Sequence, residues 1–142
     1  MIYTYDPKQI LASFAGVPIV GFAEGTFLVV SRGADAFTVH VGSDGEGART
    51  KSNDKRGTIK FTLMQSSPSN DHFSAMAVAD EKANAGVAPF FAADRSGRSL
   101  HGATNAWVKK VPDGEYANTL GNRDWVLETE NLENFIGGSN PT

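Results

Sequence analysis

The side chains that most often carry chemistry are sparse and scattered in this sequence. There is no cysteine, which excludes thiol catalysis, disulfides and cysteine-based zinc sites. The three histidines, His40, His72 and His101, lie far apart along the chain, and no pair has the i, i+4 spacing of a helical metal site. We therefore expect each of them to have an ordinary polar role.

The motifs that signal phosphate binding, nucleophilic catalysis or calcium binding are also missing. No G-x-x-x-x-G-K-[ST] loop and no G-x-S-x-G elbow occurs, and Arg95-Ser96-Gly97-Arg98 has the composition of a turn. Asp44-Gly45-Glu46 lacks the alternating oxygen ligands and the distal Glu of a calcium loop. Catalytic carboxylates need not be close in sequence, but no pattern selects a pair. We expect no enzyme activity, no cofactor and no metal.

The elements that would position any site are mainly strands. A proline at position 18 lacks a donor and places its segment at an edge or at a strand start. Consecutive apolar residues in 26–32 predict a strand covered on both faces, whereas 37–41 and 58–63 alternate as half-buried strands do. Later strands are expected over 87–93, 98–111 and 123–129, with turns at 94–97 and 112–114 and a short apolar patch at 135–138.

One helix is predicted over residues 68–83. Ser67 can cap it, Pro68 suits the first position, and Phe73, Met76 and Ala77 share one face. Gly86 is expected to provide a left-handed stop. The residues expected in the core are Ile59, Phe61, Leu63, Phe73, Val29, Phe37, Val39, Trp107 and Leu127.

Residues 43–57 form a polar, glycine-rich segment that cannot bury anything by itself, since Ala48 is its one apolar side chain. A segment this long is either functional or disordered. Two interpretations stay open, an interaction arm and a plain mobile loop.

Charge and size limit the possible partners. The net charge is −3 with an isoelectric point near 5.5, so the basic excess typical of nucleic-acid binding is missing. Six acids and one base fall within 113–133, which is either a solvated acidic face or a surface that repels a polyanion. The aromatic residues Phe90, Phe91, Trp107 and Trp125 favour core packing over base stacking. The 142 residues predict a single domain, and no membrane span or signal peptide is expected.

The order of these elements resembles the tail tube proteins of contractile-tailed bacteriophages over nearly the whole chain. No single motif is diagnostic. The residues that carry the resemblance lie in 5–8, 16–22, 41–49, 51–55, 58–63, 69–71, 94–97, 125–127 and 137–138. The resemblance implies a mainly β fold of two packed antiparallel sheets, a sandwich or partly closed barrel, flanked by one helix. It also implies hexameric rings that stack into a tube inside a contractile sheath, through which DNA passes without specific binding, and no catalytic residues.

The same resemblance sets expectations for partners and sites. The partners would be the subunit itself, the sheath, the baseplate and the tape-measure protein, in a virion assembled in the host cytoplasm. The glycine-rich segment 43–57 would contact the next ring through Asp44, Glu46, Arg49, Lys51, Asp54, Lys55 and Arg56. Acids facing the lumen or the sheath would be Asp113, Glu115, Asp124, Glu128, Glu130 and Glu133. The alternatives are a baseplate hub or tail terminator on the same fold, and a small β-sandwich binding module.

Overall fold

The computed structural model describes residue 2 and residues 4–138, and its main feature is one long antiparallel sheet. A short 3-10 helix, Pro7–Gln9, precedes the first strand. The remaining elements are β1 (Ile10–Phe14), β2 (Val17–Pro18), β3 (Leu28–Arg32), β4 (Phe37–Val41), β5 (Gly47–Lys51), β6 (Gly57–Met64), α1 (Ser69–Ala83), β7 (Ala88–Asp94), β8 (Leu100–Lys110), β9 (Asn122–Thr129) and β10 (Glu133–Phe135).

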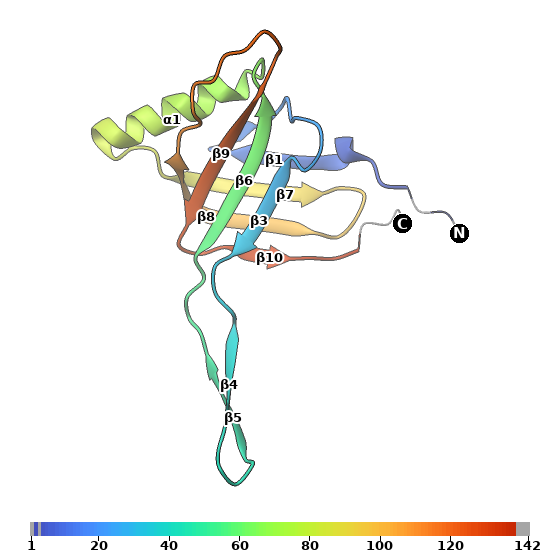
Figure 1. Ribbon diagram of the computed structural model, residues 1–142, viewed down its shortest axis with the longest axis vertical. Helices are drawn as coiled ribbons and strands as arrows, with labels where there is room; N and C mark the ends of the chain where they lie inside the picture. The colour runs from blue at the N-terminus through green and yellow to red at the C-terminus, as the bar shows by residue number, and fades with distance from the viewer. Residues whose placement is uncertain (1, 3, 139–142) are drawn as a thin grey trace.

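The main sheet has the order β2-β1-β7-β8-β9-β6-β3, with β10 paired to the edge of β8 opposite β7. The long strand β8 joins two layers, because its first half pairs with β7 and β10 and its second half pairs with β9. Figure 1 shows β7, β8 and β10 running across the view and β9, β6 and β3 running along it, with α1 at one side. The predicted mainly β fold with antiparallel sheets and one flanking helix is confirmed. The two layers are parts of one continuous antiparallel sheet, and β8 belongs to both.

The core lies between these layers and under α1. Along β6, Ile59, Phe61 and Leu63 are buried while Lys60 and Met64 are exposed, as the alternation predicted. From the helix, Phe73 packs against Phe61, with ring centroids 4.6 Å apart. Phe73 also stacks on Phe14 at 5.6 Å and lies 5.4 Å from the ring of Trp125. With Leu127, these residues confirm five of the predicted core positions.

Four other predicted core positions are wrong. Val29 and Phe37 are each 44% exposed, Val39 is 71% exposed, and Trp107 is only half-buried. Val29 is exposed because β3 is an edge strand with one uncovered face, contrary to the predicted cover on both faces. Phe37 and Val39 are exposed because β4 lies outside the main sheet. Alternation along a strand shows that one face is apolar and leaves open what covers it.

The ends of α1 fit the predicted range closely. The helix begins at Ser69, whose N–H donates to Ser67 Oγ at 3.2 Å. At the other end, Asn84 adopts the left-handed conformation with φ 53°, and its N–H closes the last turn. The predicted stop at Gly86 is therefore wrong. A Cβ at Gly86 would lie 2.4 Å from Asp80 Cβ, so its missing side chain serves a close approach to the helix.

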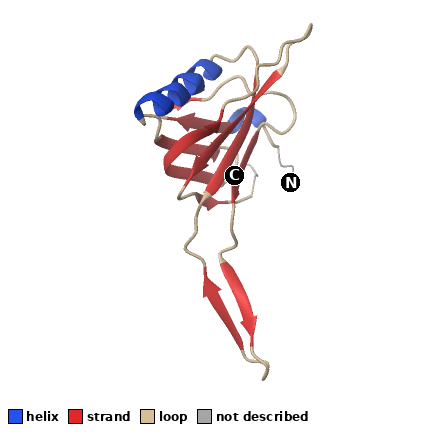
Figure 2. Cartoon of the chain, turned by 60° about the vertical axis from the view of Figure 1, so that its left-hand side comes forward, coloured by secondary structure: helices blue, strands red, loops and turns tan. Residues whose placement is uncertain are grey.

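The β4–β5 hairpin is the second sheet and projects from the body. Within residues 4–138, β4 and β5 pair only with each other, in a register from Phe37–Lys51 to Val41–Gly47. Figures 1 and 2 show this hairpin extending well beyond the body, away from the end of β3 and the start of β6. The projection includes the 37–41 strand, which the sequence had suggested as part of the body. In the part of the chain described, no helix is long and apolar enough to cross a membrane.

Candidate assembly surfaces

The root of the β4–β5 hairpin is fixed to the body by hydrogen bonds and ion pairs. The N–H of Gly33 donates to Arg56 O at 3.0 Å, and the N–H of Leu132 donates to Lys55 O at 2.9 Å. Arg32 donates from Nε and Nη2 to Leu132 O at 2.9 and 2.7 Å. Gly57 approaches Leu132 so closely that a Cβ there would lie 2.4 Å from Leu132 Cδ2. These contacts hold the start of the projection against β10.

Three of the residues predicted to contact another ring are already engaged at this root. Arg56 donates to both carboxylate oxygens of Asp54, with Nε–Oδ1 at 2.9 Å and Nη2–Oδ2 at 2.8 Å. This hydrogen bonding lowers the pKa of Asp54 and raises that of Arg56. Lys55 Nζ lies 3.7 Å from Glu133 Oε1, and Arg32 lies 3.8 Å from the same carboxylate. Within the subunit, these charges therefore orient the projection.

The other four predicted contact residues lie on the projection itself. Asp44 and Glu46 are in the tip turn, where Asp44 Oδ1 accepts from the N–H of Glu46 at 3.1 Å. Gly45 supplies the positive φ of 86° that this turn requires. Arg49 stacks over the Phe37 ring at 4.2 Å, and Lys51 pairs across the ladder with Phe37. Every residue of β4 and β5 is exposed, so these side chains are available to a partner.

The acids predicted for the lumen or the sheath do not all gather on one face. Asp124 and Glu128 share the outer face of β9, where Asp124 accepts from Thr62 Oγ1 at 2.8 Å and Glu128 lies 3.7 Å from Lys109. Asp113 and Glu115 are in the loop before β9, and Arg123 donates to their backbone oxygens at 3.2 and 3.5 Å. Glu130 accepts from Asn105 at 3.2 Å, and Glu133 belongs to the hairpin root.

The three histidines lie at separate sites. His40 is exposed on β4, His72 Nε2 lies 3.0 Å from Phe14 O, and His101 Nδ1 lies 2.8 Å from Asn134 Oδ1. Among the described residues, no group of three or more His, Asp or Glu side chains could hold a metal ion.

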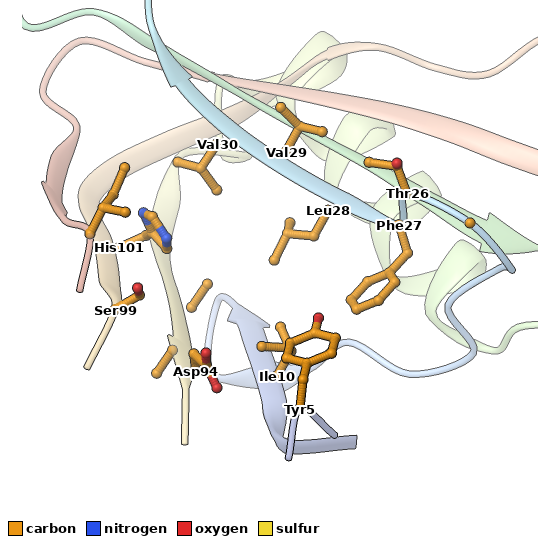
Figure 3. A pocket seen from close by; sticks show the side chains of 14 residues that line it. Tyr5, Ile10, Thr26, Phe27, Leu28, Val29, Val30, Asp94, Ser99 and His101 are labelled. Carbon is orange, nitrogen blue, oxygen red and sulfur yellow. The ribbon is translucent and has the colours of Figure 1, made fainter. Parts of the chain in front are cut away.

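A cavity of about 560 Å³ opens between the two layers, a feature that the sequence did not predict. Figure 3 shows Leu28 and Phe27 of one layer facing Ile10 and Tyr5 of the other, with polar atoms near Asp94, Ser99 and His101. These polar groups serve the turn and the β10 contact: Asp94 Oδ1 accepts from Ser96 Oγ at 2.7 Å, and Ser99 Oγ donates to Gly137 O at 3.1 Å. The cavity marks where the partly closed barrel stays open.

A second unpredicted feature is apolar surface on the outer face of the β1-β7-β8-β10 layer. The ladder places Leu11 opposite Ala93, Ala93 opposite Leu100, and Leu100 opposite Phe135. Leu11, Leu100 and Phe135 are 46%, 50% and 61% exposed. Leu11, Ala93, Leu100 and Phe135 come from four separate strands, so only the strand pairing brings them into line. A contiguous row of exposed apolar side chains is a candidate interaction surface.

This fold is that of tubes and terminators in contractile injection systems. The chain is similar to the anti-feeding prophage tube-terminating cap (TM-score 0.61, 8% identity, covering 95% of this chain and 93% of that one). It is also similar to the sheath/tube terminator of the extracellular contractile injection system PVC (TM-score 0.64, 10% identity, 95% and 99% covered). The subunit matched in the PVC sheath–tube complex gives a TM-score of 0.62 at 10% identity, with 94% and 92% covered. At these identities the likeness shows the fold alone.

Sequence comparison supplies the family. Residues 12–137 match the family described as bacteriophage PhiTE tail tube protein. The chain is also 31% identical over 144 residues to "Structural protein ORF10" of Pseudomonas phage KPP10, covering 96% of this chain and 83% of the relative. The chain belongs to the PhiTE tail tube protein family. It is thus a structural protein of a phage tail and has its place in the virion.

Proposed function

We propose that this chain forms hexameric rings that stack into the inner tail tube, through which phage DNA passes into the host. The observation that carries the proposal is the β4–β5 hairpin. It exposes Phe37, Val39 and Val41 on a projection that the body does not cover. A two-stranded hairpin is marginally stable alone in water, and a partner that covers its apolar face stabilises it. The family match makes other copies of the chain the natural partner.

Ring formation needs one contact that repeats by rotation, and stacking needs a second, different contact. Among the described residues, the main sheet has edge strands at β2, β3 and β10, which present backbone groups to a neighbour. Contacts around a ring would satisfy such edges, while the hairpin extends beyond the body toward a neighbouring ring. We expect Asp44, Glu46, Arg49 and Lys51 to meet charges on that ring. Each exposed pair would contribute only about 0–1 kcal/mol, so most of the affinity must come from apolar and backbone contacts.

The lumen must conduct DNA without holding it, because each neutralised phosphate adds salt-sensitive affinity. The outer face of β3, β6 and β9 suits this requirement. It presents hydroxyl groups at Ser31, Thr58 and Thr62, and its charges are of both signs, with Lys60 near Asp124 and Glu128. With one lysine against two carboxylates, this face has no basic stripe that would grip a polyanion, and its hydroxyl groups are uncharged. We propose that this face lines the channel.

The further partners would be those of a tail tube: a sheath around the outside, a baseplate at one end and a tape-measure protein inside. None of these roles requires catalysis, a cofactor or a metal. Assembly would take place in the host cytoplasm.

A tail terminator is the second candidate, because two of the similar structures are a tube-terminating cap and a sheath/tube terminator. The family match favours the tube. Size exclusion followed by electron microscopy of the purified protein separates the two. A tube protein forms cylinders of variable length, whereas a terminator stops at single rings. Monomers or dimers at high concentration would instead fit a binding module or a hub.

A further inference from the structure

Two exposed apolar strips in this chain have the same length. One is the row Leu11, Ala93, Leu100 and Phe135, which crosses four strands; we call it the outer apolar row. Neighbouring strands lie about 4.8 Å apart, so the row is about 14 Å long. The other is the run Phe37, Val39 and Val41 on one face of the β4–β5 hairpin. Four residue steps at about 3.4 Å per residue also span about 14 Å.

Cations accompany the apolar run on its face of the hairpin. Lys51 pairs with Phe37 and Arg49 with Val39 across the ladder, so both project from this face. The opposite face carries Thr38 and His40 and is polar. One face of the hairpin is therefore apolar along β4 and basic along β5.

The surface beside the outer apolar row carries an acidic residue that could pair with the basic strand of the hairpin. Two residues along the strands, on the same face, lies a parallel row made of Ser13, Phe91, Gly102 and Glu133. Phe91 is 51% exposed, and the Glu133 side chain is 64% exposed even though Arg32 and Lys55 lie nearby. The two charge contacts of Glu133, at 3.8 and 3.7 Å, are long and leave its carboxylate able to accept a further donor.

We propose that the outer apolar row binds the β4–β5 hairpin of a second copy of this chain, an inference that rests on the proposed stacking of rings. The β4 strand of one copy lies along the row of the other, and β5 lies along the neighbouring row. The arrangement that brings Lys51 next to Glu133 places Phe37 on Phe135 and Val39 beside Leu100. The two strips then cover each other, and the basic strand meets the acidic end of the second row.

Cysteine cross-linking tests this contact directly, since the chain has no cysteine of its own. The test variant is V39C/L100C; both sites are exposed, at 71% and 50%, so folding is not at risk. The matched control is T38C/L100C, which moves the cysteine by one residue to the opposite face of the same hairpin. Assembled protein is treated with mild oxidant or with a short bismaleimide and run on denaturing gels.

V39C/L100C should give a ladder of covalent oligomers, because each subunit has one hairpin and one row. T38C/L100C should give at least tenfold less product. No cross-link in V39C/L100C, or equal cross-linking in both variants, would overturn the proposal.

Electron micrographs of the same samples test the proposed function separately from the docking surface. Tubes without the V39C/L100C cross-link reject the outer apolar row as the docking surface and leave the tube function standing. A ladder with single rings alone keeps the docking surface and rejects stacking.

Discussion

Removing the β4–β5 hairpin should abolish tube formation and leave the subunit folded. The variant replaces residues 35–53 with Gly-Ser-Gly-Ser and keeps Ala34, Asp54 and Lys55. The N–H of Gly33 still donates to Arg56 O, and Leu132 still donates to Lys55 O, because both bonds lie on the body side of the cut. The ion pairs of Lys55 and Arg56 are also retained.

The expected change in stability is small for two reasons. No side chain of β4 or β5 is buried, so the deletion removes no core contact. Shortening the excursion between Gly33 and Arg56 about threefold lowers the loop-closure cost by ~1 kcal/mol. The free energy of unfolding, measured by denaturant titration, should therefore remain within about 1 kcal/mol of that of the parent protein.

Assembly of this deletion variant is measured by size-exclusion chromatography and negative-stain electron microscopy, at the same protein concentrations as the parent protein. The parent should form cylinders, and the deletion variant should stop at rings or subunits. A control that replaces only the tip, residues 43–46, with Gly-Ser-Gly-Ser should keep more assembly than the full deletion, because it retains Phe37, Val39 and Val41. Normal tubes from the deletion variant would refute the reasoning, and so would loss of its cooperative unfolding.

Three further predictions concern the core, the hairpin root and the lumen. Replacing the fully buried Phe73 with alanine should lower the free energy of unfolding, measured with denaturant, by about 3–5 kcal/mol. The control V78A, on the exposed face of α1, should lower it little, and equal losses in the two variants would contradict the packing. The pKa of the Asp54 carboxyl, measured by NMR, should lie below the ordinary value of an aspartate because Arg56 donates to it, and R56A should raise it again. The stabilisation by this pair is present at neutral pH and is lost as pH falls through the lowered pKa, so a titration midpoint unmoved by R56A would contradict the pairing. Assembled tubes should bind DNA weakly even at low salt, and tight binding that weakens steeply with added salt would indicate a phosphate-gripping lumen.

Local patterns predicted the inward face of β6 and the range of α1, but they did not show which strands belong to the body. The alternation at Ile59, Phe61 and Leu63 gave the correct inward face, and the Ser67–Pro68 pair gave the start of α1 to within one residue, with Pro68 at the N-cap instead of the first helical position. The same alternation at Phe37 and Val39 was misread, because nothing in the sequence showed that this strand leaves the body. The difference lies in the partner of each strand: β6 pairs with β3 and β9, and β4 pairs with β5 alone.

The candidate assembly surfaces could be read from the sequence only in part, for a related reason. The polar, glycine-rich segment 43–57 indicated an arm or a mobile loop, but the hairpin that projects runs from Phe37 to Lys51, so its first strand precedes that segment and its tip lies at the start of it. The pairing of Lys55 with Glu133 joins residues that are distant along the chain, and no local pattern shows it. The outer apolar row is equally invisible in sequence, because Leu11, Ala93, Leu100 and Phe135 are brought together only by the register of four strands.

The most direct measurement of the central claim is electron microscopy of the purified, full-length chain concentrated without any other tail protein. The proposed function predicts hollow cylinders of variable length, with six-fold end views and a regular axial repeat. Single rings that never stack, at any concentration, would contradict the tube and favour a terminator, and particles without a ring would contradict both.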